Sequence, residues 1–188
     1  SVFTVEAMSS TMSGASWEVN LSIRQLLRAT NAYHLEVPVD VTLIGANNER
    51  YDTLVTVGNS LDLLLLEAPF EPVMAVLNGH NRLNQSRMDH ERTLVPGQVL
   101  TGTLPHVDFR VYSDVVPDTL LLRVEHIWAG PYQTQLGWGI DQISSTHYWT
   151  VGGLWPTGTA MRGRIYYDGN DTTDLDHDLV GVTEEDIM

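Results

Sequence analysis

The amino-acid sequence predicts an all-β fold, with two β-sandwich modules of the immunoglobulin-like type in tandem and little helix. Apolar and polar residues alternate with a period of two along much of the chain, which is typical of half-buried strands. The alternating runs are short and follow one another at roughly 8–12-residue spacing, as the strands of a sandwich do. Segments with turn chemistry separate them, such as GANNER (45–50), AGPY (129–132) and GGLWPTG (152–158).

Five strands are expected in the first half. Regular alternation predicts half-buried strands at WEVNLSIRQ (17–25), YHLEVPVDVTLIG (33–45) and RYDTLVTV (50–57). LDLLLLEA (61–68) is more continuously apolar and predicts a strand that is covered on both faces, and PVMAVLN (72–78) follows it. Pro38 lies on the polar face of its strand and lacks a donor N–H, which indicates a sheet edge or a bulge.

The middle of the chain is polar and rich in Asn and Arg, from Asn78 to Gln98. A short helix is expected in part of this segment, with Leu83 and Arg87 as i,i+4 neighbours, and the rest is expected to be a linker. The boundary at VPGQ (95–98) then separates a first module, 1–98, from a second, 99–188. Four β-rich runs are expected in the second module: HVDFRVYS (106–113), TLLLRVEHIWAG (119–130), STHYWTVGG (145–153) and TAMRGRIYYDG (159–169).

Composition excludes several classes of protein. The chain has 188 residues, of which 43% are hydrophobic, and no apolar run approaches the roughly 20 residues of a membrane helix. It has no cysteine, which rules out disulfides, thiolate zinc sites and cysteine nucleophiles. It also lacks a basic-then-apolar leader, so any export signal is expected to have been removed or to lie upstream.

Charge narrows the range of partners. The formal net charge is −14, and all ten cationic residues are Arg. A surface this acidic repels nucleic acid and anionic membranes, so neither is an expected partner. An acidic surface without lysine is also what adaptation to high salt tends to produce, and we take salt adaptation as a hypothesis.

Catalytic motifs do not occur. The chain has no HExxH, CxxC or GxSxG and no glycine-rich phosphate loop, so no catalytic residue and no cofactor are expected. His126 shares a strand face with Val124 and Trp128 and is interpreted as an inward-facing histidine rather than a metal ligand. The same interpretation applies to His147 in STHYW.

Two groups of residues are candidates for ligand binding. Acidic residues gather around His177 in YYDGNDTTDLDHDL (166–179), and the candidates for calcium are Asp168, Asp171, Asp174, Asp176 and Asp178. An EF-hand loop needs Gly at its sixth position, and counting from Asp168 this position is Thr173. The DGND sequence (168–171) is typical of a turn. A solvated turn is therefore favoured over a calcium site. Aromatic residues gather in the second half, and the candidates for stacking on sugar rings are Trp138, Trp149 and Trp155. Core and turn packing is the alternative role for these aromatics.

The order of the strands resembles one family. The text from WEVNLSIRQ through LDLLLLEAPFEPVMAVLN (17–78) and on to Leu94 resembles the β-sandwich that follows the catalytic domain of aminopeptidase N-like zinc metallopeptidases. The residues at matching places are Gln25, Pro38, Val39, Pro72 and Asn78. The second half, from LLRVEHIWAGP (121–131) to LDHDLV (175–180), looks like a further β module found in secreted bacterial members.

This resemblance implies a non-catalytic accessory region of a larger exported peptidase, with the catalytic domain of the same parent chain as its partner. The family's HExxH and GxMEN motifs are absent, so no zinc ligand is carried over and zinc belongs to the catalytic domain of the parent. A free-standing module that binds a carbohydrate or a cell-surface protein is the alternative function. An independent hydrolase with Asp/His chemistry is a third.

Overall fold

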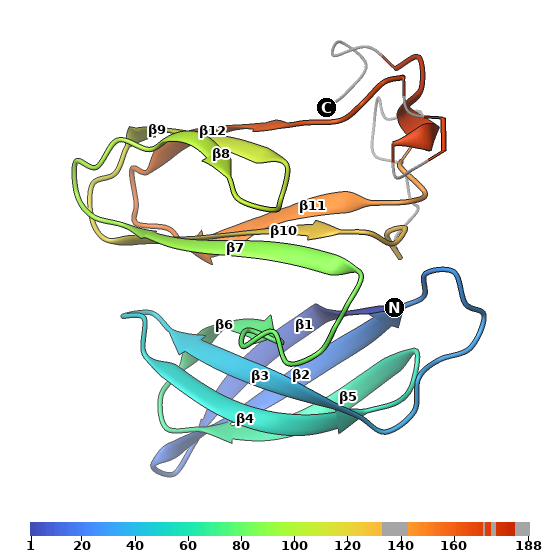
Figure 1. Ribbon diagram of the computed structural model, residues 1–188. Helices are drawn as coiled ribbons and strands as arrows, with labels where there is room; N and C mark the ends of the chain where they lie inside the picture. Colours follow the sequence, from blue (N-terminus) through green and yellow to red (C-terminus); the bar gives the residue numbers. More distant parts are fainter. Residues whose placement is uncertain (133–142, 171, 174–175, 183–188) are drawn as a thin grey trace. The chain divides into compact units, whose positions relative to one another are not determined.

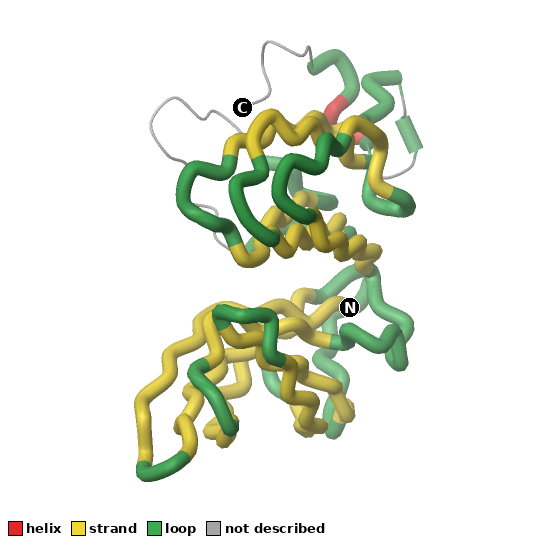
Figure 2. Tube along the Cα trace, turned by 90° about the vertical axis from the view of Figure 1, so that its left-hand side faces the viewer, coloured by secondary structure: helices red, strands yellow, loops and turns green. Residues whose placement is uncertain are grey.

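The all-β prediction is confirmed. The computed structural model describes residues 1–132, 143–170, 172–173 and 176–182, and these form twelve strands and one turn of 3₁₀-helix (Figures 1 and 2). The chain divides into two compact units, unit 1 from Ser1 to Ser86 and unit 2 from Arg87 to Met188. No helix of the described residues is long and apolar enough to cross a membrane.

Unit 1 consists of two three-stranded antiparallel sheets. The first has the order β1-β2-β5, with β1 at Val2–Ser13, β2 at Ser16–Leu26 and β5 at Leu61–Ala68. The second has the order β4-β3-β6, with β4 at Arg50–Val57, β3 at Val37–Gly45 and β6 at Pro72–Leu77. Along β3, β6 pairs only from Val41 onward, so Pro38 lies where β3 has a neighbour on one side alone, as expected for a sheet edge.

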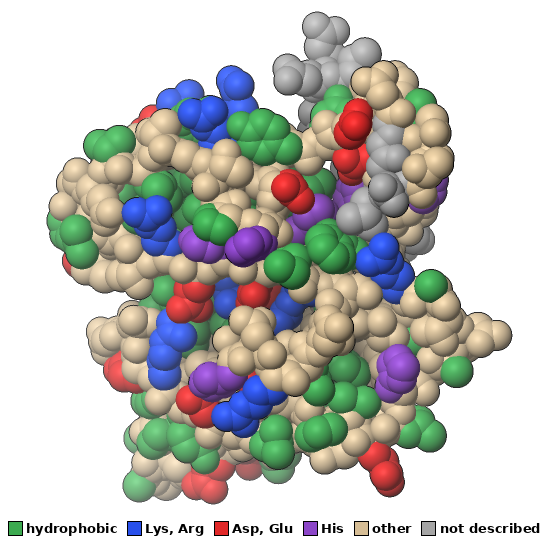
Figure 3. All heavy atoms as spheres, viewed as in Figure 1, with side chains coloured by type: hydrophobic (Ala, Val, Ile, Leu, Met, Phe, Trp, Pro, Cys, Tyr) green, Lys and Arg blue, Asp and Glu red, His purple; other side chains and the backbone are tan. Residues whose placement is uncertain are grey.

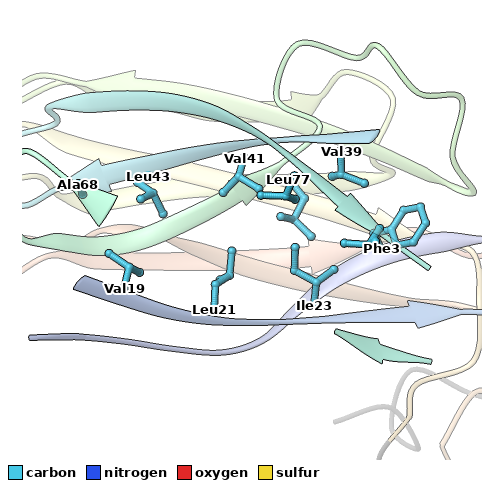
Figure 4. Close-up of a cluster of buried hydrophobic side chains, with 11 residues drawn as sticks. Phe3, Val19, Leu21, Ile23, Val39, Val41, Leu43, Ala68 and Leu77 are labelled. Carbon is cyan, nitrogen blue, oxygen red and sulfur yellow. The ribbon is translucent and has the colours of Figure 1, made fainter. Parts of the chain in front are cut away.

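Both sheets of unit 1 contribute to one hydrophobic core. Val19, Leu21 and Ile23 alternate along β2 with polar residues and are almost completely buried. They pack with Val41 and Leu43 of β3, and Figure 4 shows these side chains meeting from the two sheets. Because successive side chains of a strand point to opposite faces, the period of two seen in the sequence is what buries this set.

Strand β5 differs from its prediction. It is an edge strand that pairs with β2, and Leu64 and Leu66 pack against the core. Leu63 and Leu65 point to the opposite face and are 76% and 63% exposed. The expectation that LDLLLLEA is covered on both faces is therefore wrong, because an uninterrupted apolar run does not show whether a second layer covers its outer face.

The polar middle segment also differs from its prediction. The expected short helix does not form; instead, the side chain of Asn78 closes a loop by donating to the Leu83 carbonyl (2.8 Å) and accepting the Leu83 N–H (2.9 Å). Strand β7 then begins at Arg87 and ends at Leu94. The division between the units accordingly falls between Ser86 and Arg87, earlier than the 98/99 boundary that the sequence suggested.

Unit 2 repeats the arrangement of two three-stranded antiparallel sheets. The first has the order β11-β10-β7, with β10 at Leu120–Ile127 and β11 at Tyr148–Leu154. The second has the order β12-β9-β8, with β8 at Thr101–Leu104, β9 at Phe109–Val115 and β12 at Ala160–Ile165. A single 3₁₀ turn, η1, follows at His177–Leu179. The core draws on both sheets and the connections between them: Leu94, Leu100, Leu104, Val107, Val111, Val116, Leu120, Leu122 and Val124.

Candidate functional site

The acidic segment folds back onto the residues that lead into β11. Of the five candidate aspartates, Asp171 and Asp174 lie outside the described residues. Asp176 accepts the backbone N–H of Asp168 with Oδ2 (2.6 Å), and its Oδ1 stands 3.5 Å from Nε2 of the buried His147. The structure therefore brings this sequence-predicted segment into contact with a histidine about thirty residues earlier, which spacing alone did not indicate.

Asp178 holds the turn in front of β11. Its Oδ2 accepts hydrogen bonds from the Ser144 hydroxyl (2.8 Å) and the Ser145 N–H (2.9 Å), and its Oδ1 accepts one from the Thr146 hydroxyl (3.1 Å). Burial raises the pKa of Asp178, but these hydrogen bonds and the neighbouring His147 outweigh burial and bring the pKa below its usual value. Asp178 is therefore an ionised clamp for this turn at neutral pH.

The described carboxylates of the segment are thus engaged by the protein itself. Both oxygens of Asp176 and of Asp178 face groups of the chain, and Asp168 Oδ1 accepts the N–H of Asn170 (3.0 Å) in a local turn. Calcium takes six to eight oxygen ligands. Among the residues that the structure describes, no three His, Asp or Glu side chains are grouped closely enough to hold a metal ion. This geometry is that of a hydrogen-bonded turn.

Two buried histidines and two tryptophans, Trp128 and Trp149, form an aromatic cluster in unit 2. His126 of β10 and His147, just before β11, are 4% and 1% exposed, so their predicted inward position is confirmed. Their ring centroids are 5.3 Å apart, and Trp149 of β11 stacks on His126 at 4.2 Å with an interplanar angle of 19°. No described group makes a hydrogen bond to the ring nitrogens of either histidine.

Carboxylates approach both histidines. Asp108 Oδ2 lies 3.4 Å from Nδ1 of His126, as Asp176 does at 3.5 Å from His147. Burial lowers the pKa of His126 to about 4, and the adjacent His147 lowers it further, against the opposing effect of Asp108. His126 is therefore neutral at physiological pH. Because both rings are almost completely buried, neither is placed to meet a substrate from solvent.

The three candidate stacking tryptophans have different surroundings. Trp149 is half-buried, gives one face to His126 and donates its Nε1–H to the Val107 carbonyl (2.7 Å), so it takes part in packing. Trp155, which follows β11, is 44% exposed. Trp138 lies outside the described residues. Of the described candidates, Trp155 is the one whose ring is open to a ligand.

Unit 1 offers a different kind of surface, on the outer face of β5. Leu63 and Leu65 lie on this face, and their directly opposite neighbours on β2 are Ser22 and Asn20. The two leucines therefore lie beside short polar side chains of the neighbouring strand. Leu63 and Leu65 together form an apolar ridge along the edge of the sheet. Sequence reasoning missed this surface because it took the strand to be buried.

Comparison with known proteins adds no relative. No family model, no curated protein and no solved structure matches the chain. The resemblance to the accessory region of aminopeptidase N-like peptidases consequently stays a prediction that rests on the sequence motifs.

Proposed function

We propose that the chain is a pair of non-catalytic β-sandwich modules of the immunoglobulin-like type, forming the accessory C-terminal region of a larger exported aminopeptidase-like protein. In this role the modules pack on the zinc-containing catalytic domain of the parent chain and shape access to its active site. The division into two compact β units supports the proposal, because each unit has a core to which two antiparallel sheets contribute.

The observation that carries the proposal is the exposed ridge of Leu63 and Leu65. Contiguous exposed apolar surface is typical of protein–protein contact sites, and Leu63 and Leu65 are exposed on the same face of one strand. Burying one leucine is worth roughly 1.5–3 kcal/mol, so the pair supplies a useful share of an intramolecular interface. The catalytic domain of the same chain is the proposed occupant, because unit 1 carries the residues that resemble the sandwich beside that domain.

Some of those residues have clear structural roles in unit 1. Val39 is completely buried in the core, and the Asn78 side chain closes the loop after β6 through its two hydrogen bonds with Leu83. Gln25 is 3% exposed near the end of β2. Three of the five matching positions thus help to stabilise the β fold of unit 1, which supports the proposal.

The first test is an immunoblot of cell and medium fractions of the source organism with antibody against this chain. A band well above 21.0 kDa in an exported fraction is expected. The isolated larger protein should then show aminopeptidase activity that a zinc chelator removes. A band at 21.0 kDa would contradict the proposal and favour the free-standing binding module.

A second test addresses the ridge itself. In the larger protein, the double variant Leu63→Ser, Leu65→Ser is expected to lower the melting temperature, since it removes apolar contacts with the catalytic domain. The isolated chain should melt as before, because both side chains are exposed there. Leu54→Ser on β4, which is also an exposed leucine, is the matched control. An effect of the same size from the control would remove the ridge from the proposal.

A further inference from the structure

We propose that the outward face of β9 and β12 in unit 2 is a binding site for the carboxylate or sulfate groups of an acidic glycan. The site lies wholly within unit 2 and is independent of the leucine ridge of unit 1. It is built by three arginines, two tyrosines and two threonines.

The arginines converge on one aromatic ring. The guanidinium carbons of Arg110, Arg162 and Arg164 lie 5.1, 5.7 and 5.9 Å from the ring centroid of Tyr112. Basic side chains accordingly gather over this sheet in Figure 3. The chain has ten arginines, no lysine and a net charge of −14, so positive charge is scarce. Three of the ten arginines nevertheless lie around this one ring.

The strand register places like charges opposite each other. Arg164 of β12 pairs directly with Arg110 of β9, and Arg162 pairs with Tyr112. Like charges directly opposite across an antiparallel pair destabilise a sheet. Arg162 is neutralised by a bidentate pair with Asp114, at 2.8 Å for both contacts. The described residues supply no such carboxylate for Arg110 or Arg164, and Arg110 Nε is buried without a hydrogen-bond partner.

An oxyanion between these two guanidiniums would remove the repulsion. Directly opposite residues have Cβ atoms about 4.5–5.5 Å apart, which lets two arginine forks reach one carboxylate or sulfate. Arginine binds planar carboxylates bidentately, and charge-assisted hydrogen bonds are roughly twice as strong as neutral ones. The placement of these two like charges opposite each other therefore indicates a negatively charged ligand.

The rest of the face has groups that suit a sugar. Thr101 and Thr103 of β8 are exposed and pair with Tyr112 and Arg110, so their hydroxyls border the arginines. Tyr166 is 44% exposed and hydrogen-bonds to Arg110, and this bond holds the pKa of Tyr166 below its usual value. An exposed tyrosine ring packs on the apolar face of a sugar, while hydroxyls exchange hydrogen bonds with those of the sugar.

The charge balance limits the ligand further. A net charge of −14 repels densely charged polymers such as nucleic acid, which carries one charge per roughly 1.7 Å of duplex. A glycan with one carboxylate or sulfate per sugar presents far fewer charges per unit length and offers hydroxyls between them. An acidic glycan thus fits the few cations, the hydroxyls and the exposed ring together.

Calorimetric titration of the full chain at low ionic strength tests the site. The probes are polygalacturonate, dextran sulfate of low sulfate content, neutral dextran and polyglutamate. We expect one or both acidic glycans to bind and neutral dextran not to bind. Arg110→Gln and Arg164→Gln should each weaken binding about tenfold, as expected for the loss of a charge-assisted hydrogen bond.

Arg92→Gln is the matched control, because Arg92 is exposed on β7 and its replacement changes the net charge by the same amount. It should leave the affinity unchanged. Arg164→Gln should also leave the melting temperature equal or raise it, since the cross-strand repulsion is removed. A structural role for Arg164 predicts a lower melting temperature instead.

The two glycans identify the source of the oxyanion. Binding of polygalacturonate alone assigns the site to carboxylates, and binding of dextran sulfate alone assigns it to sulfates; both support the proposal. Binding of neither glycan overturns it, as does an equal loss of affinity in Arg92→Gln. Tighter binding of polyglutamate than of both glycans would assign the face to an acidic protein and overturn the glycan proposal.

Discussion

Acid should destabilise unit 2 through His126. This ring is 4% exposed, stacks on Trp149 and stands beside His147, so the folded protein holds it neutral. Protonation would place a charge in a buried aromatic cluster, with one carboxylate, that of Asp108, at 3.4 Å from Nδ1. The charged groups that face the pair from other elements are Asp108, Asp176 and, next to His147, Asp178.

The size of the effect follows from the pKa of His126. Burial and the nearby His147 lower this pKa from 6.5 to about 4. Each unit corresponds to about 1.36 kcal/mol, so the shift amounts to about 3 kcal/mol at most. Between these pKa values the unfolded chain binds the proton and the folded chain does not. As far as His126 is concerned, the free energy of unfolding is therefore highest above about pH 6.5. It falls as the pH drops toward 4 and levels off below that.

Urea unfolding at a series of pH values between about 7.5 and 4, followed by tryptophan fluorescence, measures this loss. Four of the five tryptophans belong to unit 2, so the signal reports mainly on that unit. The comparison is between the wild type and His126→Gln. His90 also has a pKa lowered by burial and by Arg92, but it is present in both proteins and cancels from the difference.

The expected result is a loss in the wild type that exceeds the loss in His126→Gln by about 3 kcal/mol across this range. His34→Gln, which replaces an exposed histidine of unit 1, should behave as the wild type. Since the slope with pH is compared rather than the stability itself, a structural cost of the glutamine does not obscure the result. Parallel curves for the wild type and His126→Gln would refute the reasoning.

Five further outcomes are expected. Gly153→Ala should prevent stable folding of unit 2, because Gly153 has a φ of +142° and a Cβ there would lie 1.8 Å from the Leu121 carbonyl oxygen; a near-wild-type thermal melt would contradict this. Arg123→Met leaves two carboxylates of β7 without the cation that joins them and should cost about 3–5 kcal/mol in urea unfolding. Arg162→Met removes an exposed pair and should cost less than about 1 kcal/mol, so equal costs would show that burial does not decide the effect. Millimolar calcium should leave the melting temperature unchanged, since the described carboxylates of the acidic segment already bind protein groups, and a clear rise would restore the calcium site. Dialysis into low salt should lower the melting temperature because a net charge of −14 is then less screened; unchanged melting would end the salt-adaptation hypothesis.

The sequence was most informative where one face of a strand is apolar. The runs at 17–25 and 50–57 appear as β2 and β4 with nearly the predicted bounds, whereas the run at 33–45 appears as β3 only from Val37 onward. Strand β1 was missed because VFTVEAMSSTMS carries Ser, Thr and Met instead of a clear apolar alternation beyond its first residues. Its place is fixed by pairing with β2 from Val2 to Ser13, which local pattern does not reveal.

Strand β7 was missed for a different reason. Its polar residues satisfy one another across the sheet: Arg123 of β10 contacts Asp89 and Glu91, and Arg87 contacts Glu125. The partners lie more than thirty residues away in the sequence, so the segment looks like a linker until the sheet is assembled. A hydrophobic period cannot detect a strand whose one face is held by ion pairs.

The candidate sites also depend on contacts between residues that are distant in the sequence. The sequence indicated that His126 and His147 point inward, and both rings are almost completely buried. Register decides the rest, because a shift of one residue moves every side chain to the other face of a sheet. The opposition of Arg110 and Arg164 across β9 and β12 depends on that register and was accordingly invisible in the sequence.

The distribution of arginines along the chain supports the proposed acidic glycan site. The chain has 24 acidic residues for ten arginines, so a carboxylate partner is easily supplied. Arg24 pairs with Glu6 and Arg123 with a group of carboxylates, which is the arrangement that stability favours. Arg110 and Arg164 instead face each other as like charges, which costs stability, and a hydrogen bond with Tyr166 offsets this cost at Arg110. Where a sequence accepts a local cost, function is the physical reason to look for, and here the cost disappears when an oxyanion binds.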